Sequence, residues 1–200
     1  MDVKYQSEWS KTLHKKKITS IAQNLSSDVI ATGSEDNYIR LFSVIHKKEI
    51  HTLYNQERVA LALDFHSHNT DLLFAGNNNG VAHVWSLRGR RPKYTFTSHK
   101  DAVHTAKFFS DNKAYTGSKD RSIRLWDLNR GTIIRTYMCI SPCLTSTNDG
   151  YLIYSGHKDG NLKMWAENKK QPIFEKKIHS GKISHVMLAK DNNYLVSVQF

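Results

Sequence analysis

The sequence predicts an all-β protein in which a unit of four antiparallel strands is repeated along the chain. A glycine within a turn-forming phrase recurs at positions 33, 76, 117 and 156, so successive copies lie 43, 41 and 39 residues apart. In each copy an Asp or Asn stands six residues before an aromatic side chain. Apolar and polar residues alternate between these points, as expected for strands joined by tight turns. A period of roughly 40 residues with four strands per copy is typical of a β-propeller, whose blades are such sheets.

The clearest copy of the repeat runs from Ser98 to Asp127. It opens with Ser98-His99-Lys100-Asp101, continues through Thr116-Gly117-Ser118-Lys119-Asp120 and closes with Ile123-Arg124-Leu125-Trp126-Asp127. The glycine and the aspartate suit a tight turn, and the residues that follow alternate between the two faces of a strand. A copy of this period that ends in Trp-Asp is the signature of WD repeats, so the chain resembles the WD-repeat family.

The same register places the other elements within a single domain, residues 1–200. We expect blades at residues 14–54, 55–98, 99–138 and 139–177, and part of a fifth blade at 178–200. Alternation predicts strands at 18–23, 29–33, 38–43 and 49–54 in the first blade, and at 59–65, 72–76, 81–86 and 93–97 in the second. In the fifth blade Ser197 lies 41 residues after Gly156 and is predicted to take the glycine position.

A short strand is predicted at residues 5–13, ahead of the first blade. In WD-repeat propellers such a strand completes the sheet of the last blade, which removes exposed sheet edges. Because propellers typically have four to eight blades, four blades and part of a fifth indicate a fragment of a longer ring, most familiarly seven-bladed. The alternative is an open array that a second chain completes.

The composition, 39% hydrophobic and 24% charged, is that of an ordinary globular chain. The two cysteines, Cys139 and Cys143, form no disulfide framework and give only a weak zinc signal, which favours a reducing compartment. The sequence shows neither a secretory leader nor an apolar run long enough to span a membrane, so we expect a cytoplasmic location. We expect no metal and no cofactor, because His66-x-His68 is the one ligand-like spacing and no phosphate-binding glycine loop is present.

The resemblance to WD repeats implies a buried hydrogen-bond network in each complete blade. In the third blade it would join Asp120, His99, Thr116 and Trp126 as carboxylate, imidazole, hydroxyl and indole. The other copies are partial: His14, Thr32 and Asp36 with Phe42 in the first, Asn55, Ala75, Asn79 and Trp85 in the second, and Ser155, Asp159 and Trp165 without a clear histidine in the fourth. Although these residue types also occur in catalytic triads, their recurrence in register with the blades favours a structural role, and we expect no enzyme.

Function is therefore expected on the loops. One face of the predicted propeller carries Lys15, Lys16, Lys17, Arg58, Lys100, Lys119, Arg121, Lys158 and Lys182. The opposite face carries Lys47, Lys48, Arg88, Arg90, Arg91, Arg130, Lys169 and Lys170. With a net charge of +11, these residues are either an ordinary solvated surface or a docking site for acidic side chains or phosphates.

In more detail, the chain resembles the C-terminal propeller of the autophagy-related protein 16 family. The resemblance is carried by residues 98–108 and 116–128, by Tyr154-Ser155-Gly156-His157-Lys158-Asp159 and by Gly181-Lys182-Ile183. It implies a non-enzymatic scaffold in autophagosome formation that binds other proteins through one face. Its further partners would be the autophagy conjugation machinery, which attaches a ubiquitin-like modifier to membrane lipid, or an anionic membrane surface. The protein would lie at the periphery of autophagic membranes. The alternative is a basic subunit of an RNA-processing or ribosome-assembly complex, with nucleic acid as the partner.

Overall fold

The computed structural model describes residues 12–26, 28–189 and 194–199, and all of their regular secondary structure is β-strand. The first sheet contains β1 (Ile18–Gln23), β2 (Val29–Ser34), β3 (Tyr38–Ser43) and β4 (Lys48–Tyr54). The second contains β5 (Ala60–Phe65), β6 (Leu72–Asn77), β7 (Ala82–Ser86) and β8 (Arg91–Phe96). The third contains β9 (Val103–Ser110), β10 (Lys113–Ser118), β11 (Ser122–Asp127) and β12 (Thr132–Met138). The fourth contains β13 (Cys143–Asn148), β14 (Leu152–His157), β15 (Asn161–Ala166) and β16 (Phe174–Lys177), and β17 (Ile183–Leu188) pairs with β18 (Leu195–Gln199).

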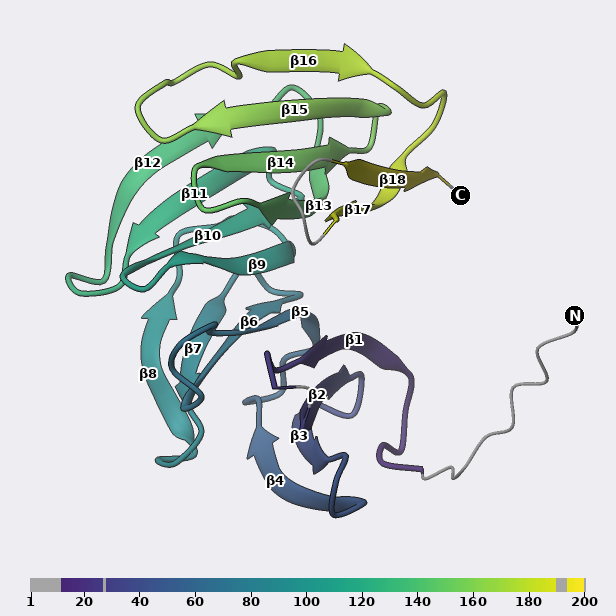
Figure 1. The fold of residues 1–200 in the computed structure, drawn as a ribbon, viewed down its shortest axis with the longest axis vertical. Coiled ribbons are helices and arrows are strands. Elements are labelled where there is room, and N and C mark those ends of the chain that lie inside the picture. The colour runs from purple at the N-terminus through teal and green to yellow at the C-terminus, as the bar shows by residue number, and fades with distance from the viewer. Residues whose placement is uncertain (1–11, 27, 190–193, 200) are drawn as a thin grey trace, which may run out of the picture.

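Within each sheet the strands are antiparallel and follow one another in chain order. The sheets stand around an open arc, with the first strand of each on the inside and the fourth on the outside (Figure 1). Neighbouring sheets meet through their first strands, since β1, β5, β9, β13 and β17 pack side by side. The predicted all-β architecture of repeated four-stranded blades is confirmed.

The hydrophobic core lies between neighbouring sheets. Three interfaces place the aromatic residue near the end of the third strand of one sheet against the preceding sheet, as Trp85, Trp126 and Trp165 do. Tyr115 and Tyr137 of the third sheet, both fully buried, meet Trp165 of the fourth in this way. Each internal sheet therefore buries both of its faces, which explains the long apolar runs in the second and third strands.

The recurring glycine marks the place where one sheet approaches the next. A Cβ atom added at Gly117 would lie 2.5 Å from Thr105 Cγ2 and 2.7 Å from Cys143 Sγ, and one at Gly76 would lie 2.7 Å from Val103 Cγ1. Cys143 thus occupies the position that Val103 holds one sheet earlier, and its thiol packs on the glycine. Glycine recurs at this point because any side chain would push the neighbouring first strand away.

The two cysteines are packing residues. Both are free and buried, and burial raises the pKa of the Cys139 thiol to about 12 and that of Cys143 well above its ordinary value. Within the described part of the chain, no three His, Cys, Asp or Glu side chains are placed to hold a metal ion. No helix in the same part of the chain has the length and apolar character needed to cross a membrane.

Two predictions at the ends of the chain have different outcomes. The closing strand predicted at residues 5–13 lies outside the described residues, except for residues 12 and 13, which belong to no strand. The placement of Ser197 in the glycine position is wrong. Ser197 pairs with Val186 as Thr116 pairs with Ala106, and Val198 pairs with His185 as Gly117 pairs with Thr105. The prediction was one residue off because the spacing of the copies varies, whereas strand pairing determines the register.

Candidate functional site

The third sheet contains a four-membered hydrogen-bond chain. Asp120 Oδ2 lies 2.8 Å from His99 Nδ1, and His99 Nε2 lies 2.7 Å from Thr116 Oγ1. Trp126 Nε1 donates to Thr116 Oγ1 at 2.9 Å. With the His99 Nδ1 proton directed at the carboxylate, Nε2 accepts from the Thr116 hydroxyl, so every member has a partner. The chain joins the segment before the sheet to its second and third strands.

Two opposing effects act on the pKa values of His99 and Asp120 in this hydrogen-bond network. Burial lowers the pKa of His99, and the Asp120 carboxylate only partly offsets that effect. Burial alone would raise the pKa of Asp120, but hydrogen bonds from Ser122 and His99 hold it below its ordinary value. The pair therefore holds a neutral imidazole beside a carboxylate at neutral pH.

The first sheet repeats this arrangement without its last member. His14 Nδ1 lies 3.0 Å from Asp36 Oδ2, and His14 Nε2 lies 2.8 Å from Thr32 Oγ1. Phe42, which stands where Trp126 stands in the third sheet, has no side-chain N–H to donate to Thr32. The backbone N–H of Lys15 donates to Asp36, as that of Lys100 donates to Asp120, so the turn carboxylate also holds the incoming chain.

In the second sheet the network is broken, and the structure corrects the assignment of Trp85 to it. Ala75 replaces the threonine, so Trp85 Nε1 is buried without a hydrogen-bond partner among the described residues. Asn55 takes the histidine position and its Nδ2 donates to Asn77 Oδ1 at 2.7 Å instead. Sheet two therefore joins its incoming segment to its second strand by the Asn55–Asn77 bond, and the indole of Trp85 in its third strand is held by packing alone.

In the fourth sheet a histidine from a different position completes the network. His157 Nε2 lies 2.8 Å from Ser155 Oγ, which accepts from Trp165 Nε1 at 2.8 Å. His157 Nδ1 donates to the carbonyl oxygen of Ser141 at 3.0 Å, so a backbone acceptor replaces the carboxylate. The assignment of Asp159 to the network is corrected, because its oxygens accept from the backbone and side-chain N–H groups of Asn161.

His157 was missed by sequence reasoning because it does not precede the first strand. It ends the second strand, where Ser118 stands in the third sheet, and it reaches the same hydroxyl from the other side. The absence of an opening histidine in the fourth copy, together with a histidine directly after the glycine, was the available signal.

These networks offer no surface at which a substrate could react. His99, Thr116, Ser155 and His157 are all buried, and their polar atoms face one another. A nucleophile and its base must reach a substrate atom, and these side chains do not. The geometry is that of a structural hydrogen-bond network that joins neighbouring strands.

The His66-x-His68 pair is also occupied. His66 Nδ1 accepts from the backbone N–H groups of His68 and Asn69, and its Nε2 donates to the Asp111 carbonyl at 3.2 Å. His68 Nδ1 lies 2.7 Å from Asp111 Oδ1. Both His66 nitrogens are used to hold the β5–β6 turn against the third sheet, so His66 has no lone pair free for a metal.

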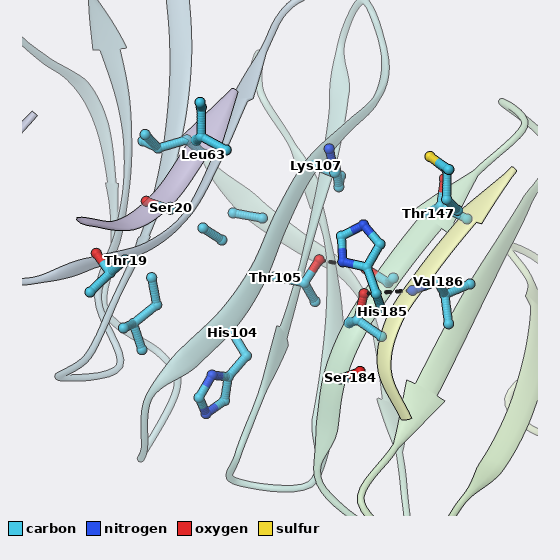
Figure 2. A pocket seen from close by; sticks show the side chains of 17 residues that line it. Thr19, Ser20, Leu63, His104, Thr105, Lys107, Thr147, Ser184, His185 and Val186 are labelled. Carbon is cyan, nitrogen blue, oxygen red and sulfur yellow. Dashed lines mark hydrogen bonds between the residues drawn. The ribbon is translucent and has the colours of Figure 1, made fainter. Parts of the chain in front are cut away.

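The first strands line a polar groove on the inner side of the arc (Figure 2). Its polar side chains are paired across neighbouring strands, with Thr105 Oγ1 2.6 Å from Ser146 Oγ and Lys107 Nζ 2.8 Å from Asp64 Oδ1. Burial, with the nearby charge of Lys119 as a second cause, lowers the pKa of His104 at one end of the groove. The groove is therefore lined by five strands, and these four polar side chains already have partners.

The sheets have two ends, and the basic candidates are divided between them. At one end, here named the linker face, the segment leading into each sheet meets the turn between its second and third strands. Backbone hydrogen bonds join the two, as from Lys119 N to Ala102 O at 2.9 Å and from Lys158 N to Pro142 O at 3.1 Å. The linker face carries the predicted binding residues Arg58, Lys100, Lys119, Arg121, Lys158 and Lys182.

The other end, the hairpin face, carries the β7–β8 turn with Arg88, Arg90 and Arg91. These three are exposed, and the backbone N–H of Arg88 donates to Asp71 Oδ1 at 2.6 Å. Six candidates on one face and three on the other cannot contribute to one binding site. On the hairpin face bases and carboxylates are also closely associated, as in the Lys113–Glu167 ion pair at 2.6 Å.

Known proteins share this repeat. The family model described as "WD domain, G-beta repeat" matches residues 7–43, 90–127 and 138–166, together more than half of the chain. Residues 44–89, which it leaves unmatched, hold most of the sheet whose network is broken. The chain is 31% identical over 185 residues to "Protein tipD" of Dictyostelium discoideum, covering 90% of this chain and 30% of that protein. It is 29% identical over 185 residues to "Autophagy-related protein 16" of Arabidopsis thaliana, covering 89% and 36%.

A third relative has a different description. "Guanine nucleotide-binding protein subunit beta" of Solanum tuberosum is 30% identical over 149 residues, which covers 68% of this chain and 40% of that protein. The chain thus spans well under half the length of each of these relatives. The strand order, the buried networks and the family match agree, and the chain belongs to the WD domain, G-beta repeat family.

Proposed function

We propose that this chain is a protein-interaction module of a cytoplasmic adaptor that acts, like autophagy-related protein 16, in autophagosome formation. The likeness to the Arabidopsis protein over most of this chain supports the autophagy assignment. Because the chain spans about a third of that relative, the role of the whole protein is part of the proposal. Conjugation machinery, or an anionic membrane surface beside it, is the partner class in keeping with this role.

The observation that carries the interaction role is the exposed, unpaired charge of the linker face. No ion pair joins its lysines and arginines to a carboxylate within the described residues. Two carboxylates of the same turns, Asp36 and Asp120, are turned inward toward the network histidines. Bases in the turns and linkers of packed sheets, with no internal carboxylate partner, are suited to an acidic surface of another protein.

An exchange experiment tests the autophagy assignment. The matched stretch of the Arabidopsis autophagy-related protein 16 is replaced by this chain in plants lacking the native protein, and autophagosomes are counted after starvation. The matched stretch of the Solanum guanine nucleotide-binding protein subunit beta serves as a control from the same repeat family. We expect this chain to restore autophagosomes and the control to fail. Equal results from both would contradict the assignment.

Nucleic acid is the second candidate partner, and the net charge of +11 favours it. Binding to a fluorescent RNA would then weaken steeply with salt, in proportion to the number of phosphates contacted. The linker-face segments described here offer few exposed aromatic side chains for base stacking, which single-stranded RNA binding commonly uses. Tight RNA binding at physiological salt, together with failure of the exchange, would favour this candidate.

A further inference from the structure

Arg121 lies at a turn position where the other sheets have asparagine or glycine. The residue after the turn Asp or Asn has positive φ in all four sheets, and it is Asn37, Gly80 and Gly160 in the first, second and fourth. In the third sheet it is Arg121, with φ 66°. A long side chain at this angle is strained, whereas glycine is free of strain there. Strained residues of this kind cluster at sites of function.

A second exception lies beside the first. The segment of residues 138–142, which links the third sheet to the fourth, exposes 68% of Met138 and 82% of Ile140. The corresponding link between the second and third sheets contains the buried His99 and a charged Lys100 instead. The backbone N–H of Cys139 donates to the Arg121 carbonyl at 2.8 Å, so the exposed apolar segment crosses the strained turn.

The surrounding charge is basic and available. Lys119 and Arg121 flank this segment on one side, and Lys158, whose N–H donates to Pro142, flanks it on the other. All three are exposed, and none forms an ion pair with a carboxylate of the described residues. The nearby Asp120 carboxylate accepts from His99, Ser122 and the Lys100 backbone, so its oxygens are occupied there and form no direct ion pair with these three bases.

We propose that Arg121 and Ile140 form the centre of a docking site for an extended acidic segment of a partner protein, in which an apolar side chain is flanked by carboxylates. This inference rests on the proposed interaction role of the linker face and specifies its partner. The guanidinium would bind a carboxylate with two parallel hydrogen bonds, and the apolar side chain would pack on Ile140 and Met138. Lys119 and Lys158 would attract the flanking acids.

The arrangement favours a protein segment over a membrane. A membrane surface attracts a protein through summed positive charge, and the aspartates Asp101, Asp120 and Asp159 lie among the lysines and reduce that sum. A local Arg–carboxylate pair depends on geometry at one residue, so these aspartates weaken it less.

Fluorescence anisotropy with two labelled peptides tests the site on the purified 200-residue chain. The first peptide has a leucine flanked by aspartates and glutamates, and the second has serine in place of the leucine. We expect the first to bind more tightly. Arg121→Ala and Ile140→Ser should each weaken it about tenfold, the loss typical of a central interface residue. Arg130→Ala, on the hairpin face, should leave binding unchanged.

A third variant separates lost binding from lost folding. Arg121→Gly relieves the strained turn, so its melting temperature should rise while its peptide affinity falls as in Arg121→Ala. Unchanged affinity in Arg121→Gly, equal binding of the two peptides, or preferential binding of phosphatidylserine vesicles through Ile140 would overturn the proposal.

The exchange experiment distinguishes this proposal from the proposed function. If the exchanged chain restores autophagosomes and its Arg121→Ala, Ile140→Ser form does so equally, the site is wrong and the function stands. If the exchange fails but the peptide binds through Arg121 and Ile140, the docking site stands without the autophagy assignment.

Discussion

Asp120 is the residue that joins the second–third turn of the third sheet to the segment that precedes the sheet. Its carboxylate accepts from His99 Nδ1, from the backbone N–H groups of Lys100 and Ser122, and from the Ser122 hydroxyl. It thereby fixes the incoming segment and the second–third turn at once. Asp159, at the same position of the fourth sheet, holds only Asn161 by its side chain.

This difference gives a matched pair of substitutions. Asp120→Ala should lower the free energy of unfolding by about 2–3 kcal/mol, because it leaves buried donors without an acceptor. Asp159→Ala should cost clearly less, because the His157 network uses the Ser141 carbonyl instead. Urea denaturation of both variants measures the difference. Equal losses would show that the turn, and not the network, carries the stability.

His83 makes stability depend on pH. Burial, with the nearby Arg58 charge as a second cause, lowers its pKa from 6.5 to about 4. Below pH 6.5 His83 therefore binds a proton in the unfolded chain but not in the folded chain. Its contribution to the free energy of unfolding is complete above that pH and is lost as the pH falls towards 4. Burial lowers the pKa of His99 and His157 as well, and these act in the same direction.

The substitution His83→Gln isolates this effect. The unfolding free energy, followed from pH 7 to pH 4, should decline less steeply in the variant. The slope should decrease by at most the contribution of the one proton that His83 binds only in the unfolded state. Parallel curves for the wild type and His83→Gln would show that His83 is protonated equally in both states.

Residue types in register were enough to anticipate the chain from Asp120 to Trp126, because all four positions are filled in one copy. They could not reveal His157 or the unpartnered Trp85. A hydrogen bond depends on where an atom lies, and the same hydroxyl can be reached from the preceding segment or from the end of its own strand. The strain at Arg121 likewise follows from φ, which the sequence indicates only through Asn37, Gly80 and Gly160 at the matching positions.

At the scale of the element, the second sheet differs from its neighbours. Its strands were predicted within two residues of their observed bounds, because alternation and turn residues specify them locally. Its interior was less predictable. Trp85 Nε1, Asn77 Nδ2 and His83 Nε2 are buried without partners among the described residues, which indicates that this sheet is the least satisfied of the four.

Ala75→Ser should repair part of this deficit. In the fourth sheet Ser155, at the matching position, accepts the indole N–H of Trp165 at 2.8 Å, so a serine here can serve Trp85 in the same way. We expect a gain of about 1 kcal/mol in unfolding free energy. The double-mutant cycle with Trp85→Phe provides the control, because the gain should vanish when the N–H is removed. A gain that persists in the Phe background would assign it to another cause.

At the scale of the whole molecule, the arc leaves the face of the first sheet without a neighbour among the described residues. Ile18 is 49% exposed and Ile21 67%. The residues at the matching positions of the later sheets, such as Ala60 and Leu63, are buried against the preceding sheet. These isoleucines therefore belong to a surface that the repeat normally covers with another sheet, in keeping with the expected ring.

The two ends of the arc, at the first sheet and at β18, are not equivalent. β18 carries Val198 at the position where glycine admits the next first strand in sheets one to four. A first strand with Ile18 would meet this side chain, so the ends of two copies should not join as closely as sheets within one chain do. The order of the repeats was predictable from the sequence, but this mismatch was not, because it follows from a register that only strand pairing determines.

The purified 200-residue chain should therefore associate weakly through the exposed face of β1. Sedimentation at increasing concentration should show a rising average mass, because burying Ile18 and Ile21 removes apolar surface from water. The double substitution Ile18→Ser, Ile21→Ser should lower this tendency and leave the melting temperature nearly unchanged, since both side chains are already exposed. Ile45→Ser, in the exposed β3–β4 turn, is the matched control and should leave association unaffected. If the double variant associates as strongly as the wild type, another surface joins the copies, and the β1 face has no part in assembly of the isolated chain.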